Sequence, residues 1–73
     1  MSNDWKARIT ADTAVLAGKP TVRGIRISVE QVVRALANGV PEAELLADYP
    51  DLKPDDLRAC MAYTADLIAA EQV

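Results

Sequence analysis

The chain has 73 residues, of which 51% are hydrophobic, 26% charged and 4% aromatic, and its net charge is −3. A chain of this length supports one domain with a small core, and this composition excludes an intrinsically disordered protein. It lacks the run of about 18 apolar residues that a membrane span needs, and its first residues do not resemble a signal peptide. We therefore expect a cytoplasmic protein that does not enter a membrane.

The charges are divided unevenly along the chain. Residues 1–40 hold six basic and three acidic residues, a net charge of +3. Residues 41–73 hold two basic and eight acidic residues, a net charge of −6. Because each half attracts partners of the opposite sign, the first half favours nucleic acid and the second favours a basic protein.

The N-terminal part is expected to contain a flexible arm, residues 1–7, followed by short strands or a hairpin over residues 8–27. Gly24 interrupts the β-prone residues, and a bend there would place Val22 and Ile25 on one face. Because such short strands are marginally stable alone, they need to pack on helices or pair with a second chain. The β-prone segments are 8–10, 21–23 and 25–27, and a turn is predicted at 18–20.

The clearest helix is predicted over residues 28–39. Ser28 and Gln31 have the spacing of a capping box, in which each side chain bonds the backbone amide of the other residue. Asn38 and Gly39 end the helix, since glycine readily adopts the left-handed conformation found there. A buried stripe follows the helical repeat: Val29, Val32, Val33 and Leu36.

Two further helices are predicted, over residues 41–49 and 54–70. Each begins with a proline, which suits the first helical position, and has acidic residues in its first turn, which suit the helix dipole. Pro50 forces Tyr49 out of helical geometry and so ends the first of them. The expected apolar face of the last helix is Leu57, Cys60, Met61, Thr64 and Ile68, with Tyr63 and Leu67 beside it. Residues 8–73 therefore form one mainly α domain, with short strands before a trihelical, helix-turn-helix-like core.

The chain resembles the domain-of-unknown-function family 433. Residues 18–29 match its signature of Gly-Lys-Pro, two β-branched residues and Arg-Gly-x-Arg-Ile. Residues 36–42 resemble the end of its first helix, and residues 45–52 resemble its Asp-Tyr-Pro-x-Leu element. Residues 59–63 resemble its third helix, so that the match spans about residues 8–68 in unbroken order.

Three positions depart from the pattern of that family. Ile25 stands where threonine is usual, Ser28 where proline is often found, and Lys53 where serine or threonine commonly caps the third helix. The last change should weaken the cap by about 1 kcal/mol. None of the three changes the arginines or the glycine of the signature.

This resemblance implies a homodimer and an antitoxin of the VapB type that acts beside a PIN-like ribonuclease toxin. In that role the strand region would dimerise, another surface would neutralise the toxin, and the basic half would also bind operator DNA. The residues expected to contact nucleic acid or the partner are Lys19, Arg23, Arg26 and Arg8.

Each of these candidates also has a plainer interpretation. Arg23 and Arg26 would also suit a solvated strand edge guarded by charge. The third helix stands where a recognition helix would, but Asp55 and Asp56 in its first turn repel phosphates, so the basic N-terminal region is the better DNA candidate. Trp5 is either a residue of a disordered tail or an anchor in a dimer or partner interface, and interface enrichment favours the anchor.

Gly18 and Gly24 are assigned to backbone turns, since their spacing does not match a phosphate-binding glycine loop. Catalysis is not expected, because the chain has no histidine and Cys60 falls on an apolar helix face. No metal site or cofactor is expected either. Four aspartates fall close together in sequence, two of them explained by the helix dipole: Asp48, Asp51, Asp55 and Asp56.

Three functions therefore remain, of which a purely structural dimer subunit is the third. The first is an antitoxin-like binding module, which predicts a tight complex with a basic protein. The second is a stand-alone DNA-binding transcriptional regulator without a toxin, which predicts DNA binding that depends strongly on salt.

Overall fold

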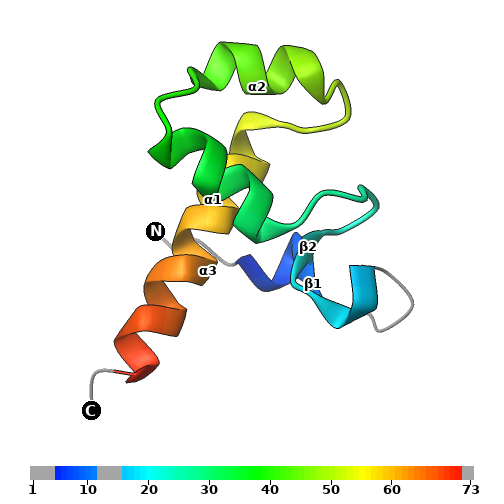
Figure 1. Cartoon of the computed structure of the whole chain (residues 1–73). Helices are drawn as coiled ribbons and strands as arrows, with labels where there is room; N and C mark the ends of the chain where they lie inside the picture. Colours follow the sequence, from blue (N-terminus) through cyan, green and yellow to red (C-terminus); the bar gives the residue numbers. More distant parts are fainter. Residues whose placement is uncertain (1–4, 12–15, 72–73) are drawn as a thin grey trace.

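The computed structural model describes residues 5–11 and 16–71 (Figure 1). In this part of the chain, three α-helices follow a two-stranded sheet: β1 Ile9–Thr10, β2 Thr21–Val22, α1 Val29–Ala37, α2 Glu42–Asp48 and α3 Pro54–Glu71. Two single-turn 3-10 helices, η1 Trp5–Ala7 and η2 Leu16–Gly18, precede the two strands. The predicted mainly helical fold with short N-terminal strands is confirmed.

The sheet is small because the chain turns soon after β2. β1 and β2 are antiparallel, with Ile9 opposite Val22 and Thr10 opposite Thr21. On the other side of β2, a single bridge joins Thr21 to Ser28. The strand expected over residues 25–27 is therefore wrong: this segment forms part of a turn and returns to β2 only at its end.

α1 has the caps that its sequence predicts. The Gln31 amide donates to Ser28 Oγ at 3.0 Å, and the Ser28 amide donates to Gln31 Oε1 at 2.9 Å. At the other end, Gly39 has a φ of 88°. Its amide donates to the Leu36 carbonyl at 3.0 Å, and the Val40 amide donates to the Ala35 carbonyl at 3.1 Å. These two bonds form a Schellman motif, which satisfies carbonyls that the helix leaves unpaired.

α2 and α3 begin in different ways. Pro41 lies one position before α2, with an extended ψ of 146°, and therefore is not its first helical residue as predicted. The extended Tyr49, with a φ of −126° and a ψ of 83°, ends α2 before Pro50 as expected. Pro54 is the first residue of α3, in agreement with the prediction.

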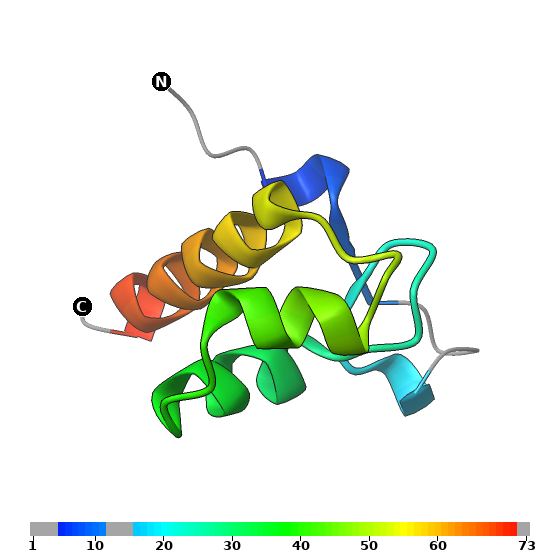
Figure 2. The same ribbon diagram turned by 90° about the horizontal axis from the view of Figure 1, so that it is seen from above.

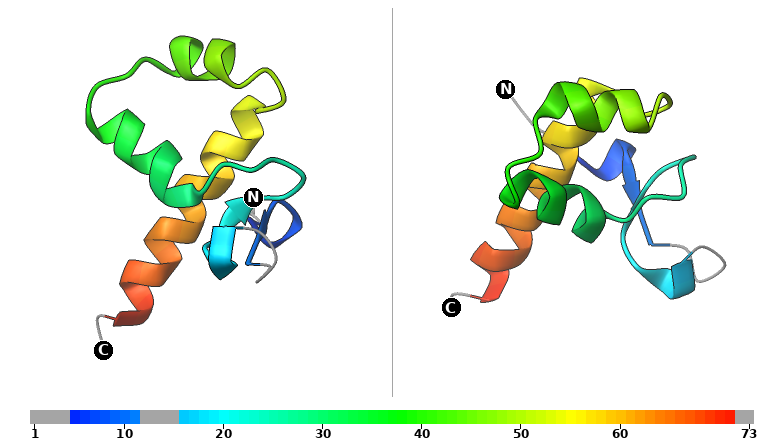
Figure 3. Two further views of the ribbon diagram at one scale, coloured as in Figure 1. Left: turned by 45° about the vertical axis from the view of Figure 1, so that its right-hand side comes forward. Right: turned by 45° about the horizontal axis from the view of Figure 1, so that its top comes forward.

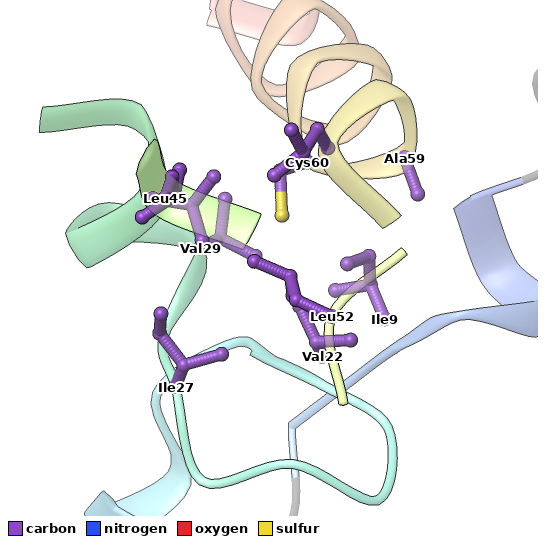
Figure 4. Close-up of a cluster of buried hydrophobic side chains, with 10 residues drawn as sticks. Ile9, Val22, Ile27, Val29, Leu45, Leu52, Ala59 and Cys60 are labelled. Atoms are coloured by element: carbon purple, nitrogen blue, oxygen red, sulfur yellow. The ribbon is translucent and has the colours of Figure 1, made fainter. Parts of the chain in front are cut away.

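The core lies between the two-stranded sheet and the three helices. Figure 4 shows side chains from β1, β2, α1, α2 and α3 converging, with Cys60 fully buried among them. α1 and the N-terminal segment both pack against α3 (Figure 2). The buried apolar residues are Ile9, Val22, Ile27, Val29, Val32, Leu45, Leu52, Leu57, Ala59 and Cys60.

The predicted apolar face of α3 is buried only in its first half. Leu57 and Cys60 are 2% and 0% exposed, whereas Met61, Leu67 and Ile68 are 45%, 50% and 50% exposed. The helix extends beyond α1, so α1 covers its later residues only in part (Figures 1 and 3). Among the described helices, none is long and apolar enough to cross a membrane.

Candidate functional site

Two of the predicted contact residues lie on a turn, residues 23–26, which we call the arginine turn. The Ile25 amide donates to the Val22 carbonyl at 3.0 Å, and the Val22 amide donates to the Ile27 carbonyl at 3.1 Å. Gly24, with a φ of 82°, occupies the position of this turn that requires a positive φ. A side chain at Gly24 would meet no atom within 4 Å, so backbone conformation rather than space selects glycine here.

The arginines of this turn are exposed but are held differently. The Arg23 guanidinium donates to the carbonyls of Ala7 and Lys6 at 3.3 and 3.4 Å. Because carbonyls are neutral, these bonds orient Arg23 without cancelling its charge. Arg26 is exposed and makes no side-chain hydrogen bond or ion pair with the described residues. The arginine turn therefore presents two positive charges to solvent.

Arg8, which is also predicted to contact nucleic acid or a partner, forms ion pairs with two carboxylates of α3 and stays partly exposed. Its Nη1 lies 2.9 Å from Asp56 Oδ1, and its Nη2 lies 3.6 Å from Asp55 Oδ2. Asp56 is buried, and its Oδ2 also accepts a bond of 2.9 Å from the Lys53 amide. Asp56 thus accepts the bond from the cap-residue amide that forms one half of a capping box at the start of α3. The other half is missing, because the side chain of Lys53 has no acceptor for a backbone amide.

Lys19 lies with α1 rather than with the arginine turn. Its Nζ is 3.7 Å from Glu30, which also pairs with Arg34 at 3.1 Å. The hydrogen bond from Arg34, and then the charge of Lys19, hold the pKa of Glu30 below its usual range. Gly18, before Lys19, has a φ of 84°, in keeping with its assignment to a turn.

Trp5 does not lie in a loose arm. Its ring meets Tyr63 of α3 edge to face, with centroids 4.8 Å apart, and its Nε1 donates to Asp66 Oδ2 at 2.7 Å. Trp5 is therefore an anchor within its own chain, and residues 5–7 form η1 on α3. Residues 1–4 of the predicted arm lie outside the described residues.

Several exposed carboxylates lie on α2 and the loop after it, and no sequence motif predicted them as a binding surface. Glu44 and Asp48 are one helical turn apart on the exposed surface of α2, and Asp51 follows in the loop. We call Glu44, Asp48 and Asp51 the acidic surface. The uneven charge of the two halves of the chain was the signal for it.

An apolar groove of about 440 Å³ lies between α1 and the second half of α3. Val29, Val33 and Ala37 of α1 form one wall, and Tyr63 and Leu67 of α3 form the other. Sequence reasoning missed this groove because it assigned the whole apolar face of α3 to the core of the chain itself.

Cys60 is buried in the core. Burial, and to a smaller extent the charge of Asp56, raise the pKa of the Cys60 thiol to about 11, so it stays protonated near neutral pH. Across residues 5–11 and 16–71, no three cysteine or carboxylate side chains form a group that could hold a metal ion.

The chain is similar to proteins of one family. The model of the family described as a protein of unknown function, DUF433, matches residues 9–64. A crystal structure of a DUF433 member protein from Anabaena variabilis is 36% identical, with a TM-score of 0.77. The match covers 81% of this chain and 58% of that chain, so this chain spans less than two thirds of the length of that protein. No curated protein matches the chain. With more than half of its length matched by the family model, the chain belongs to the DUF433 family.

Proposed function

We propose that the chain is a non-enzymatic, antitoxin-like binding protein that neutralises a PIN-like ribonuclease toxin. The observation that supports this most is the acidic surface, in which Glu44, Asp48 and Asp51 are all exposed. With the residues that the structure describes, none of these three carboxylates forms an ion pair, unlike Asp55, which is shared between Arg8 and Arg58. Their charge is therefore available to a partner.

The chemistry of a ribonuclease suits such a surface. An enzyme that binds RNA needs positive charge to attract phosphates. The carboxylates of the acidic surface, on α2 and the loop after it, attract the same positive charge and would compete with RNA for it. Opposite charges on the two surfaces also speed association, most strongly at low salt.

The test is co-expression with the product of the neighbouring reading frame, followed by size-exclusion chromatography with light scattering. We expect a stable complex of the two proteins. In binding kinetics, Glu44→Gln with Asp48→Asn should slow association roughly tenfold at low salt and much less at high salt. Ala11→Lys, which raises net charge at an exposed residue after β1, is the control and should have little effect.

Two results would count against this function. The first is elution of the neighbouring protein apart from the chain at every salt concentration. The second is a complex that the acidic-surface variant leaves unchanged, which would place the interface elsewhere.

A second candidate, a stand-alone DNA-binding regulator, is favoured by the arginine turn. The turn presents Arg23 and Arg26 to solvent, on the basic half of the chain. Titration of the upstream DNA at two salt concentrations tests it. Loss of one phosphate contact in Arg26→Ala should reduce the slope of log K against log salt by about 1. Arg58→Ala, on the acidic half, is the control and should leave the slope unchanged.

A further inference from the structure

The core-facing stripe of α3 continues past the core of its own chain. Leu57 and Cys60 begin this stripe and are buried, at 2% and 0% exposure. Thr64, Leu67 and Ile68 continue it at the helical repeat, but Leu67 and Ile68 are each 50% exposed. Figures 1 and 3 show this end of α3 projecting beyond α1. An apolar stripe in this position indicates a helix that is covered by something outside the chain.

The apolar groove lies next to this projecting end and shares Leu67 with it. One molecule thus carries both a groove and, on the same helix, an exposed apolar ridge. Such a pair is what a two-fold symmetric contact requires, because each copy then offers its ridge to the groove of the other.

The charges around the two features are also complementary. Lys19, Glu30 and Arg34 lie at the α1 side of the groove, with one net positive charge among them. Over residues 61–71, α3 carries Asp66 and Glu71 and no basic residue. Asp66 accepts a hydrogen bond from Trp5, whereas Glu71 forms no ion pair with the described residues, so its charge is available to a positive group of another molecule.

We propose that the projecting end of α3, with Leu67 and Ile68, packs into the apolar groove of a second copy of this chain, and that Glu71 lies near Arg34 of that copy. The contact is two-fold symmetric. It differs from the dimer that the resemblance implied through the strand region. Strands β1 and β2 have two residues each and offer few hydrogen bonds to a partner.

The first test measures the mass of the purified chain by sedimentation equilibrium over a range of concentrations. We expect a monomer–dimer equilibrium that Leu67→Glu abolishes while the circular dichroism spectrum is kept. Ala43→Glu, on the exposed side of α2, adds the same charge outside the groove and should leave the equilibrium unchanged. A wild-type chain that stays monomeric at about 200 μM, well above the Kd of a stable interface, overturns the proposal.

The second test separates this contact from any other dimer. Arg34→Glu and Glu71→Lys should each weaken dimerisation about fivefold, and the double variant should recover most of the loss. Glu71→Lys should leave α3 itself intact, since a positive charge at a helix C-terminus is favourable. A dimer insensitive to Leu67→Glu and to these charge changes overturns the proposal. Because every measurement uses the chain alone, the result does not depend on whether the chain binds a toxin.

Discussion

Asp56 shows how one buried carboxylate joins distant parts of a small protein. It accepts a bond from the Lys53 amide at the start of α3, and it pairs with Arg8 from the N-terminal segment. A buried carboxylate without partners would be costly, and these two contacts offset that cost. The helix start and the docking of β1 are therefore stabilised together.

Replacement of this carboxylate should be among the more damaging single changes. We expect Asp56→Ala to lower the free energy of unfolding by about 2 kcal/mol, because it removes two hydrogen bonds to a charged group. Asp55→Ala removes an exposed pair at 3.6 Å and should cost less than about 0.5 kcal/mol. Urea unfolding followed by circular dichroism measures both, and equal losses would show that Asp56 has no special role.

The Cys60 thiol makes stability depend on pH in the alkaline range. Its pKa is about 11 in the fold, above its ordinary value of 9.0, because burial opposes the thiolate. The unfolded chain therefore loses this proton first, and the stability contributed by the buried thiol falls as pH rises from 9.0 towards 11. We expect the melting temperature of the wild type to fall more steeply over this range than that of Cys60→Ala. Parallel curves would contradict the burial of the thiol.

The ends of α1 illustrate what sequence can predict at the scale of an element. The capping box of Ser28 and the glycine after Asn38 were both identified correctly, because a cap depends on residues close in sequence. Pro54 was placed correctly for the same reason. Pro41 was placed one residue too far into its helix, since proline is also tolerated just before the first turn.

Contacts between distant elements could not be predicted in this way. The partners of Trp5 lie on α3, 61 residues away for Asp66, and nothing near Trp5 in sequence indicates them. The ion pair of Arg8 with Asp56 could not be predicted either, because the two residues are 48 positions apart in the sequence. The groove could not be predicted from the apolar periodicity of α3. That periodicity shows which side of the helix is apolar but not how far the core extends along it.

Gly39 allows a test of the helix end itself. Its φ of 88° is strained for residues with a side chain, although a Cβ there would have no atom within 4 Å. We expect Gly39→Ala to lower the free energy of unfolding by about 1 kcal/mol. Asparagine tolerates this conformation better, so Gly39→Asn should cost less. If urea unfolding finds the two variants equally stable, backbone conformation does not determine the choice of glycine.

At the scale of the whole molecule, α3 is the element on which the rest assembles. α1 packs on it, and η1 and β1 reach it from the N-terminal segment. The chain has one tryptophan, Trp5, so its fluorescence reports the docking of η1 on α3. Circular dichroism reports the helices instead.

We expect both signals to change in a single urea transition with the same midpoint. The reason is that Trp5 and Arg8 tie the N-terminal segment to α3, and a domain of this size usually unfolds cooperatively. A fluorescence change at clearly lower urea would show that η1 leaves α3 while the helices stay folded. Asp66→Ala removes the hydrogen-bond acceptor of the indole. It should lower the urea midpoint followed by fluorescence more than the midpoint followed by circular dichroism.

The tie between the N-terminal segment and α3 also has a consequence for synthesis on the ribosome. Trp5 is made 61 residues before Asp66, and Arg8 is made 48 residues before Asp56. At about 5–20 residues per second, Trp5 waits roughly 3 to 12 seconds for its partner. During that interval the indole ring and β1 lack α3, the helix on which they pack. Trp5 and Arg8 therefore cannot reach their partners on α3 until most of the chain has been made.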